Sequence, residues 1–201
     1  MKDGQTINEF LEFYKTEMKP GKYWQLPKDK KGEQEALLYN ENYYAGAKND
    51  GEWAKLIVGD GYIQIQSRNI SKKTGTYNDK TPSLPHVVAA AKMIYQPGTV
   101  LLGELCFEDP KKTSKDVGAI MRCLPEKAIQ RQEEGEKLVF KVFDVLAMNK
   151  IATHTFKAEN RMNIIINMPV GGGIMLTEFS DNPKQLLEKV LDRGGEGIVL
   201  M

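Results

Sequence analysis

The chain has 201 residues, of which 41% are hydrophobic and 27% charged, so it can bury a core as one globular unit. Its 28 basic and 27 acidic side chains give a formal charge of +1. This balance excludes a protein that attracts nucleic acid through a strong overall positive field, although local basic patches remain compatible with such a partner.

Cysteine and histidine are sparse, and apolar runs are short. Cys106 and Cys123, with His86 and His154, are too few and too scattered for a disulfide framework or a four-ligand zinc site. The first residues are polar, and no stretch approaches the length of a membrane span. We therefore expect a cytoplasmic protein with no membrane association.

The first part of the sequence predicts one helix and then a hairpin. Residues 6–18 have apolar positions at helical spacing, with Thr6 and Glu9 in the relation of a capping box. Residues 20–35 are charged and interrupted by proline and glycine, which predicts a loop. A Gly-Asp-Gly turn at 59–61 is typical of a hairpin. The strands expected in this part are residues 42–48, 52–58 and 61–67.

The remaining sequence predicts helices inserted between apolar strands. One helix is expected at residues 86–95, and a helical stretch at 114–135 is interrupted by Pro125. Another helix begins at Pro183 after a capping Asn182 and ends at two glycines. The strands expected here are residues 99–107, 137–146 and 197–201. Because strands and helices do not alternate strictly, we predict an α+β fold with largely antiparallel sheets.

Reactive side chains gather at the ends or in the middle of these strands. A lysine and an acid lie two positions apart beside a glycine, and both would point the same way if the chain stayed extended. Two further acids lie within or just before apolar strands, where a carboxylate is costly unless it is paired or binds a cation. The candidate residues are Lys48, Asp50, Gly51, Ser67, Arg68, Glu104 and Glu196.

Five short elements occur in one order along residues 43–201: KNDG, SRN, LLGEL, VFKVFDVL and GGEGIVL. Together they resemble the motif set of the covalent nucleotidyltransferases, and most closely that of the ATP-dependent DNA ligases. The resemblance implies an ATP-grasp-like nucleotidyltransferase domain, in which mainly antiparallel sheets with flanking helices enclose a nucleotide pocket. It also implies that residues 41–201 are the adenylation domain and that residues 1–40 belong to the same unit.

The resemblance implies that Lys48 attacks the α-phosphate of ATP and becomes joined to AMP, while Asp50 orients the lysine and later assists the 3′-hydroxyl of a nick. An amine must be neutral to attack phosphorus, so the pocket and a bound Mg²⁺ must favour the uncharged lysine. The resemblance puts Glu104 near the ribose and Glu196 near the metal. Both acids are candidate ligands of Mg²⁺.

Further contacts to the nucleotide and to DNA are implied by the same resemblance. Ala47 and Gly51 are expected beside the nucleotide, where glycine permits close approach of the backbone. Phe143 is expected to stack on adenine, a contact worth roughly 1 to 3 kcal/mol. Arg68, with Ser67, is expected to hold the 5′-phosphate of the nick. The implied cofactors are ATP and Mg²⁺, and the implied partner of this monomer is nicked double-stranded DNA.

Two departures from the family pattern bear on activity. Trp53 occupies the position where the ligase element usually has an arginine that contacts the nucleotide sugar. A strand with two lysines and an oligonucleotide-binding domain are expected to follow GEGIVLM, and the sequence ends at Met201. We therefore expect a fragment of a small bacterial or viral ligase of DNA repair, replication or recombination, with weak or absent adenylylation of its own.

Other interpretations of the same residues stay open. The chain is alternatively an RNA ligase, a capping-type nucleotidyltransferase, or a catalytically inactive member of the fold that binds nucleic acid. Taken singly, Lys48 has the ordinary interpretation of a surface lysine, Phe143 that of a core aromatic and Arg68 that of a solvated turn residue. The order of the five elements favours the ligase interpretation.

Overall fold

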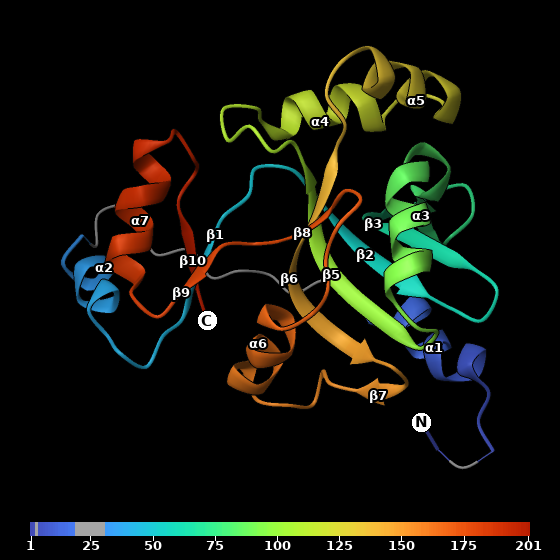
Figure 1. Cartoon of the computed structure of the whole chain (residues 1–201), viewed down its shortest axis with the longest axis horizontal. Coiled ribbons are helices and arrows are strands. Elements are labelled where there is room, and N and C mark those ends of the chain that lie inside the picture. The colour runs from blue at the N-terminus through green and yellow to red at the C-terminus, as the bar shows by residue number, and fades with distance from the viewer. Residues whose placement is uncertain (3, 19–30) are drawn as a thin grey trace.

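Two β-sheets organise the chain, and the computed structural model describes residues 1–2, 4–18 and 31–201 (Figure 1). The larger sheet has the strand order β4-β3-β2-β5-β6-β7, with β8 paired to β6. It comprises β2 (Glu52–Val58), β3 (Ile63–Ile70), β4 (Tyr77–Asp79), β5 (Thr99–Cys106), β6 (Val139–Met148), β7 (Ile151–Ala152) and β8 (Ile174–Leu176). Among the described strands, β6 and β8 are parallel and the other pairs are antiparallel.

The smaller sheet has the order β10-β1-β9 and brings together distant parts of the sequence. It comprises β1 (Ala45–Ala47), β9 (Phe179–Ser180) and β10 (Ile198–Leu200). Helix α7 (Pro183–Asp192) packs on it through Leu186 and Val190, which form an apolar cluster with Ala45. The predicted cap is confirmed, because the Asn182 side chain accepts a hydrogen bond from the Gln185 N–H at 3.0 Å.

One face of the larger sheet carries most of the core. Alternate residues of β2, namely Ala54, Leu56 and Val58, point into this core, as period-2 alternation requires. The covering helices are α3 (Pro85–Ile94), α4 (Ser114–Met121), α5 (Pro125–Glu134) and α6 (Ala158–Ile166). The predicted α+β fold is therefore confirmed, and so is the interruption of the 114–135 stretch, because α5 begins at Pro125.

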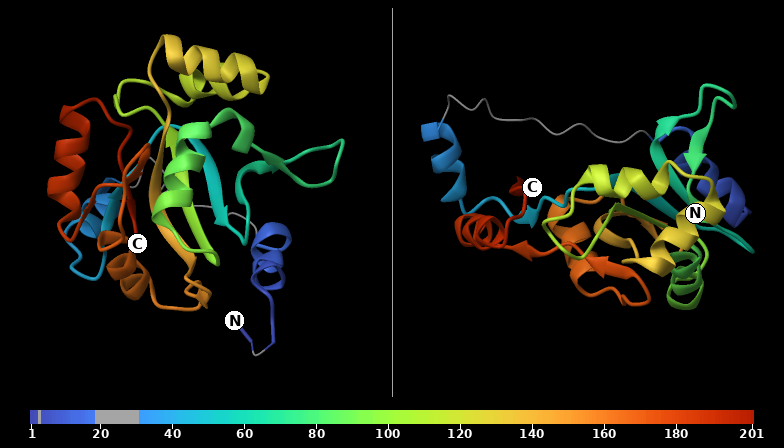
Figure 2. Two further views of the ribbon diagram at one scale, coloured as in Figure 1. Left: turned by 45° about the vertical axis from the view of Figure 1, so that its right-hand side comes forward. Right: turned by 90° about the horizontal axis from the view of Figure 1, so that it is seen from above.

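The opposite face of the larger sheet is covered by α1 (Ile7–Thr16) at one end. Phe10, Leu11 and Tyr14 pack there against Ile57 of β2 and its neighbours. The predicted capping box is confirmed: the Thr6 N–H donates to Glu9 Oε2 at 2.7 Å, and the Glu9 N–H donates to Thr6 Oγ1 at 3.2 Å. Figure 2 shows α1 at one end of the molecule and α7 with the smaller sheet at the other.

The β2–β3 hairpin has the predicted turn. The Gly59 N–H donates to the Tyr62 carbonyl at 2.9 Å, and Gly61 has a φ of +77°, which favours glycine. Strand β3 begins two residues later than predicted and continues to Ile70. Strand β1 is shorter than predicted, because it ends at Ala47.

Part of the predicted 20–35 loop is wrong, because helix α2 (Lys31–Leu38) begins within it. Its sequence, KGEQEALL, contains mostly strong helix formers, whose intrinsic preference outweighs the charge and the single glycine. Residues 20–30 of that prediction lie outside the described residues. Within the described ranges, no helix has the length and apolar character needed to cross a membrane.

Candidate active site

Lys48 lies in the short connection that joins the smaller sheet to the larger one. Its N–H donates to the Gly197 carbonyl at 2.8 Å, and the preceding Ala47 N–H donates to the Glu178 carbonyl at 2.8 Å. These bonds continue the pairing of β1 with its neighbours past the end of the strand. They hold the Lys48 backbone between two segments that are more than 120 residues away in the sequence.

The Lys48 side chain forms an ion pair with Glu196, from its Nζ to Glu196 Oε1. Glu196 lies just before β10, and β10 pairs with β1 in the register that aligns Ala47 with Ile198. Both side chains remain partly exposed, at 35% for Lys48 and 42% for Glu196. The structure therefore brings together two of the predicted site residues and leaves them accessible to a ligand.

Glu104 lies in the middle of β5 and faces the same region. The pKa of Glu104 is raised to about 8, mainly by burial; the Lys48 ammonium opposes this shift, and the carboxylates of Asp50, Glu196 and Glu52 contribute to it. The Glu104 carboxyl is therefore mostly protonated at neutral pH. These mutual effects follow from the closeness of Lys48, Asp50, Glu104 and Glu196, which the sequence predicted to converge.

Asp50 is held by the neighbouring helix. The Ser114 N–H, in the first turn of α4, donates to Asp50 Oδ1 at 3.0 Å. A carboxylate is favourable at this end of a helix, where N–H groups and the helix dipole present positive charge. The predicted strand 42–48 ends one residue earlier than expected, at Ala47, so both Lys48 and Asp50 follow β1, and Asp50 is oriented by α4.

Gly51 is required by close packing against β5. A Cβ atom at this position would lie 2.2 Å from the Leu105 carbonyl oxygen and 2.8 Å from Cγ of Glu104. The connection from Lys48 to β2 therefore runs beside β5 at a distance that only glycine permits. The predicted approach of Gly51 to the nucleotide stays a prediction.

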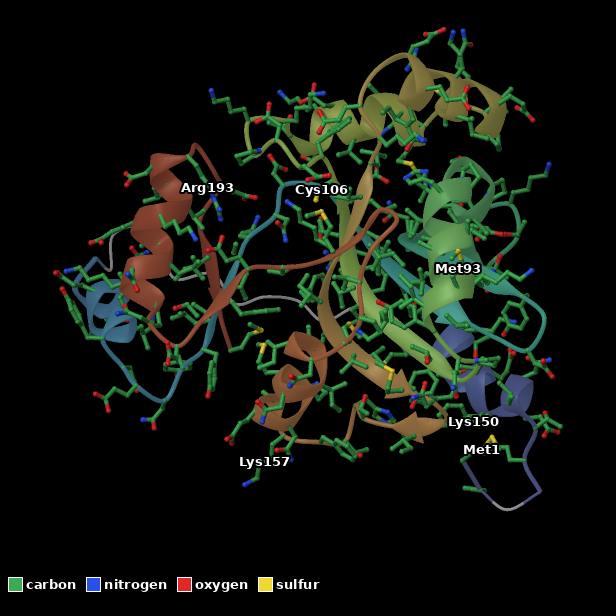
Figure 3. The ribbon with its side chains drawn as sticks, viewed as in Figure 1. Met1, Met93, Cys106, Lys150, Lys157 and Arg193 are labelled. Carbon is green, nitrogen blue, oxygen red and sulfur yellow. The ribbon has the colours of Figure 1, made fainter. Side chains whose placement is uncertain are left out.

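A polar cavity of about 220 Å³ opens beside Lys48. Figure 3 labels two of its lining residues, Arg193 directly after α7 and Cys106 at the end of β5. The predicted residues Ala47, Lys48 and Asp50 line this cavity, as does Glu196. Its other charged lining residues are Glu108, Asp109, Lys112, Lys141, Glu178 and Arg193.

A second cavity, of about 230 Å³, is apolar and contains Phe143. Phe143 is the extra residue of a β-bulge, because Val142 pairs with Gly103 and Asp144 pairs with Leu102. Asp144 is held at the cavity by Arg161, whose Nε and Nη2 lie 2.8 and 3.1 Å from the two carboxylate oxygens. The other lining residues are Tyr44, Trp53, Leu102, Ala158, Met162, Ile165 and Met201.

The same four segments contribute to both cavities. On β6, Lys141 lines the polar cavity and Phe143 the apolar one, about 6 to 7 Å apart along the strand. On β5, Cys106 lines the polar cavity and Leu102 the apolar one, and Glu104 lies between them along the strand. Around β1, Lys48 lines the polar cavity and Tyr44 the apolar one. Around β10, Glu196 lines the polar cavity and Met201 the apolar one. The arrangement suits an elongated ligand with one flat apolar end and one anionic end.

The predicted pair for the 5′-phosphate lies within β3 and not after its end. Arg68 is exposed, whereas Ser67 is buried, at 6% exposure, with its hydroxyl 3.4 Å from the Asn69 carbonyl. Both residues lie in an irregular stretch where β3 has more residues than β4 between two aligned pairs. Neither belongs to the residues that line the two cavities.

The predicted metal ligands fit a divalent cation by charge. Burial is the main cause of the raised pKa of Glu104, and the carboxylates of Asp50, Glu196 and Glu52 also raise it, so a cation would favour the ionised form of Glu104. Oxygen ligands are those that Mg²⁺ prefers. In the described part of the chain, no group of three or more His, Cys, Asp or Glu side chains is already arranged around a metal. Further ligands would come from water or from a bound phosphate.

Sequence analysis did not find several cavity residues. Lys141, Lys112 and Arg193 line the polar cavity, and Tyr44 lines the apolar one. One signal was available for Lys141: it lies two positions before Phe143 in a strand, so alternation puts both on one face. The others come from loops and helix ends, which strand patterns do not predict.

Comparison with known families agrees with this geometry. Residues 25–201 match the family described as ATP dependent DNA ligase domain. The chain belongs to this family. The resemblance to the adenylation domain of ATP-dependent DNA ligases is thereby confirmed over most of the chain. No curated protein sequence matches it.

Solved structures show that the fold is that of the ligase domains. The chain is 17% identical to the ligase domain from M. tuberculosis LigD, with a TM-score of 0.56 over 79% of this chain and 48% of that one. The chain is also 17% identical to mycobacterial DNA ligase D complexed with ATP and MES, with a TM-score of 0.53 over 79% of this chain and 47% of that one. The chain spans about half the length of these solved structures. The predicted nucleotidyltransferase fold is confirmed.

Proposed function

We propose that this ligase-family domain transfers AMP from ATP to Lys48 and then to the 5′-phosphate of a DNA nick. In the first step, the neutral Nζ attacks the α-phosphorus, an N–P bond forms, and the bond to the leaving pyrophosphate breaks. The amine loses a proton, and pyrophosphate carries away the electron pair of the broken P–O bond. The observation that carries the proposal is the position of Lys48 in a polar cavity whose walls continue into the apolar cavity of Phe143.

The two cavities support one orientation of the nucleotide. Adenine would lie against Phe143 in the apolar cavity, where a flat base gains stacking contact. The ribose would lie beside Glu104, which stands on β5 between the two cavities, and the phosphates would extend into the polar cavity beside Lys48. Ala47 and Gly51 flank Lys48 and would be the backbone contacts to the nucleotide.

Lys48 forms an ion pair with Glu196 in the free protein, so the amine must separate from this partner and be neutral before it attacks. Glu196 and Glu104 would hold Mg²⁺. Bound there, the cation would disfavour the ammonium form and neutralise phosphate charge. The Asp50 carboxylate, which accepts a hydrogen bond from the N-terminus of α4, would act as the general base in the later steps.

Nicked double-stranded DNA is the proposed partner. The exposed Arg68 would hold the 5′-phosphate as a guanidinium fork, while Ser67 would act through the local geometry of β3 because its own side chain is buried. An oxygen of the 5′-phosphate would attack the phosphorus of lysyl-AMP, the N–P bond would break, and the Lys48 amine would leave. The 3′-hydroxyl would then lose its proton to Asp50 and attack the AMP-activated phosphate, and AMP would leave with the electron pair of the broken P–O bond. We propose that the protein does this as a monomer in the cytoplasm.

Trp53 changes one contact in this scheme. It lines the apolar cavity with Phe143 and Tyr44, so the usual arginine contact to the sugar is replaced by aromatic surface. An aromatic side chain supplies contact area but lacks the guanidinium fork for sugar hydroxyls. The nucleotide is then held more by its base and its phosphates than by its sugar.

The test is covalent labelling with α-labelled ATP and magnesium, using the full-length gene product. We expect label that survives denaturation in the wild type, no label in Lys48→Ala, and normal label in Lys92→Ala. Lys92 is an exposed lysine of α3 and lies away from both cavities. Absence of label in the wild type would contradict the proposal and favour an inactive, nucleic-acid-binding member of the fold. Sealing of nicks with DNA or RNA at the 3′ side then separates a DNA ligase from an RNA ligase.

A further inference from the structure

Lys141 is a cation of the polar cavity that the proposed mechanism has not used. It lies on β6 directly opposite Glu104 of β5, and Glu104 is in turn opposite Trp53 of β2. Residues opposite each other in a sheet put their side chains on the same face. Lys141 therefore shares the face of the larger sheet that carries Glu104, and it lines the cavity together with Lys48.

The other cations of this cavity are already paired. Lys48 pairs with Glu196, and the Lys112 ammonium lies 2.8 Å from Glu136 and 4.2 Å from the centre of the Phe107 ring. Arg193 lies 2.5 Å from Glu178. Lys141, by contrast, forms no ion pair with any residue in the described ranges.

The surroundings of Lys141 leave its charge available to a ligand. Two titratable residues of β5 lie on the same face of the larger sheet: Glu104, directly opposite Lys141 and not in an ion pair with it in the described ranges, and Cys106. Burial raises the pKa of the Cys106 thiol to about 12, and the Lys141 ammonium opposes the shift. The thiol is thus neutral and does not compensate the lysine. Asp109, which also lines the cavity, accepts a hydrogen bond from the Lys111 N–H at 2.9 Å. An anion that enters the cavity is the partner that Lys141 lacks.

Lys48 and Lys141 approach this space from different sheets. Lys48 follows β1 of the smaller sheet, whereas Lys141 belongs to β6 of the larger one. In phosphoryl-type transfer, the attacking and leaving atoms lie roughly in line on opposite sides of phosphorus. A phosphorus atom attacked by Lys48 therefore releases its leaving group on the side away from Lys48, and Lys141 is the cation that the larger sheet contributes to the same cavity.

We propose that Lys141 binds the β- and γ-phosphates of the nucleotide and stabilises the pyrophosphate that leaves when Lys48 attacks. This inference rests on the proposed function of the site. As the bond between the α-phosphorus and the bridging oxygen breaks, negative charge grows on pyrophosphate, and the Lys141 ammonium stabilises it without transferring a proton. A fixed cation at such a position acts mainly on the transition state and the leaving group.

The test compares Lys141→Gln with Lys141→Arg and with Lys115→Gln, whose lysine is exposed on α4 outside the cavity. Single-turnover labelling at several ATP concentrations gives the rate and the apparent affinity, and calorimetry with inorganic pyrophosphate gives the affinity for the leaving group. We expect Lys141→Gln to slow labelling about 100-fold and to weaken pyrophosphate binding about tenfold. Lys141→Arg should keep most of both, and Lys115→Gln should match the wild type.

Two results separate the inference from the proposed function. Wild-type labelling and pyrophosphate affinity in Lys141→Gln would overturn the inference and leave the function of Lys48 intact. An unlabelled wild type would overturn the proposed function. It would also contradict the proposed catalytic role of Lys141, because no pyrophosphate would then be released. Circular dichroism verifies folding; if Lys141→Gln is unfolded, Lys141→Met, which keeps the aliphatic stem, replaces it in the same measurements.

Discussion

The polar and apolar cavities differ in chemistry although the same strands build them. The polar cavity has lysines, an arginine and carboxylates around Lys48, whereas the apolar one has Phe143, Trp53 and Tyr44 with one bidentate Asp144–Arg161 pair. Strand alternation alone would give one face a uniform character. The division instead runs along the strands, so a ligand bound across both must change from apolar to anionic along its length.

A variant that removes the nucleophile but keeps its positive charge tests the role of the polar cavity. Lys48→Arg retains a cation for Glu196, but a guanidinium is always protonated and cannot attack phosphorus. We expect adenylylation to fall by about 10⁴-fold or more, with thermal stability close to that of the wild type. Single-turnover labelling with α-labelled ATP measures the rate. A variant that labels at a tenth of the wild-type rate would contradict the assignment.

Gly51→Ala would disturb the connection between the two sheets. The added methyl group would lie 2.2 Å from the Leu105 carbonyl oxygen, so β2 and β5 must shift. We expect the free energy of unfolding to fall by about 1 to 3 kcal/mol, measured by urea denaturation. Gly32→Ala in α2 is the matched control, because its methyl group meets no atom within 4 Å. Equal effects at the two positions would show that the contact with β5 is unimportant.

Phe143→Ala would test the apolar side. Loss of the stacking surface should weaken ATP binding by roughly 10- to 100-fold, from about 1 to 3 kcal/mol of stacking. Phe143→Tyr keeps an aromatic ring and should bind ATP nearly as well as the wild type. Calorimetric titration with ATP measures both. If tripolyphosphate binding falls as much as ATP binding in Phe143→Ala, the division between the two cavities is wrong.

Glu104, between the cavities, should give the protein a pH-dependent stability. Its folded-state pKa of about 8 lies above the ordinary value of 4.5, so the folded protein binds this proton more tightly than the unfolded chain does. The resulting stability is fully present below about pH 4.5 and is lost as the pH rises through 8. Solvent screening of the partly exposed carboxyl keeps the loss to about 1 to 2 kcal/mol.

Chemical denaturation at several pH values between 4.5 and 8.5 measures this loss. Glu104→Gln mimics the protonated acid and should flatten the decrease, whereas Glu133→Gln, at an exposed position of α5, should leave it unchanged. A decrease of the same size in Glu104→Gln would assign the pH dependence to other groups.

Sequence patterns predicted the parts of the fold that depend on local chemistry. The α1 capping box, the turn at 59–61 and the interruption of the 114–135 helical stretch at Pro125 were all predicted, because each follows from a few adjacent residues. Helix α2 was missed because its charges and glycine resemble those of a loop. The short strands β7, β8 and β9 were missed because two or three residues carry too little periodicity.

Part of the site was predicted from the resemblance to the ligase motif set and not from local patterns. The approach of Lys48 to Glu196 followed from ordered motifs, and the structure contains their ion pair. The hydrogen bond from α4 to Asp50 and the contact of Gly51 with β5 depend on how distant elements pack, which local patterns do not specify. Lys141 was missed because its neighbours in the strand are apolar, which led to the interpretation of the whole strand as part of the core.

A crystal structure with bound ATP is the most direct test that the two cavities form one nucleotide site. We predict adenine against Phe143, the α-phosphate beside Nζ of Lys48, and the β- and γ-phosphates on the wall that carries Lys141. A nucleotide whose base occupies the polar cavity, or whose phosphates lie away from Lys48, would contradict the account.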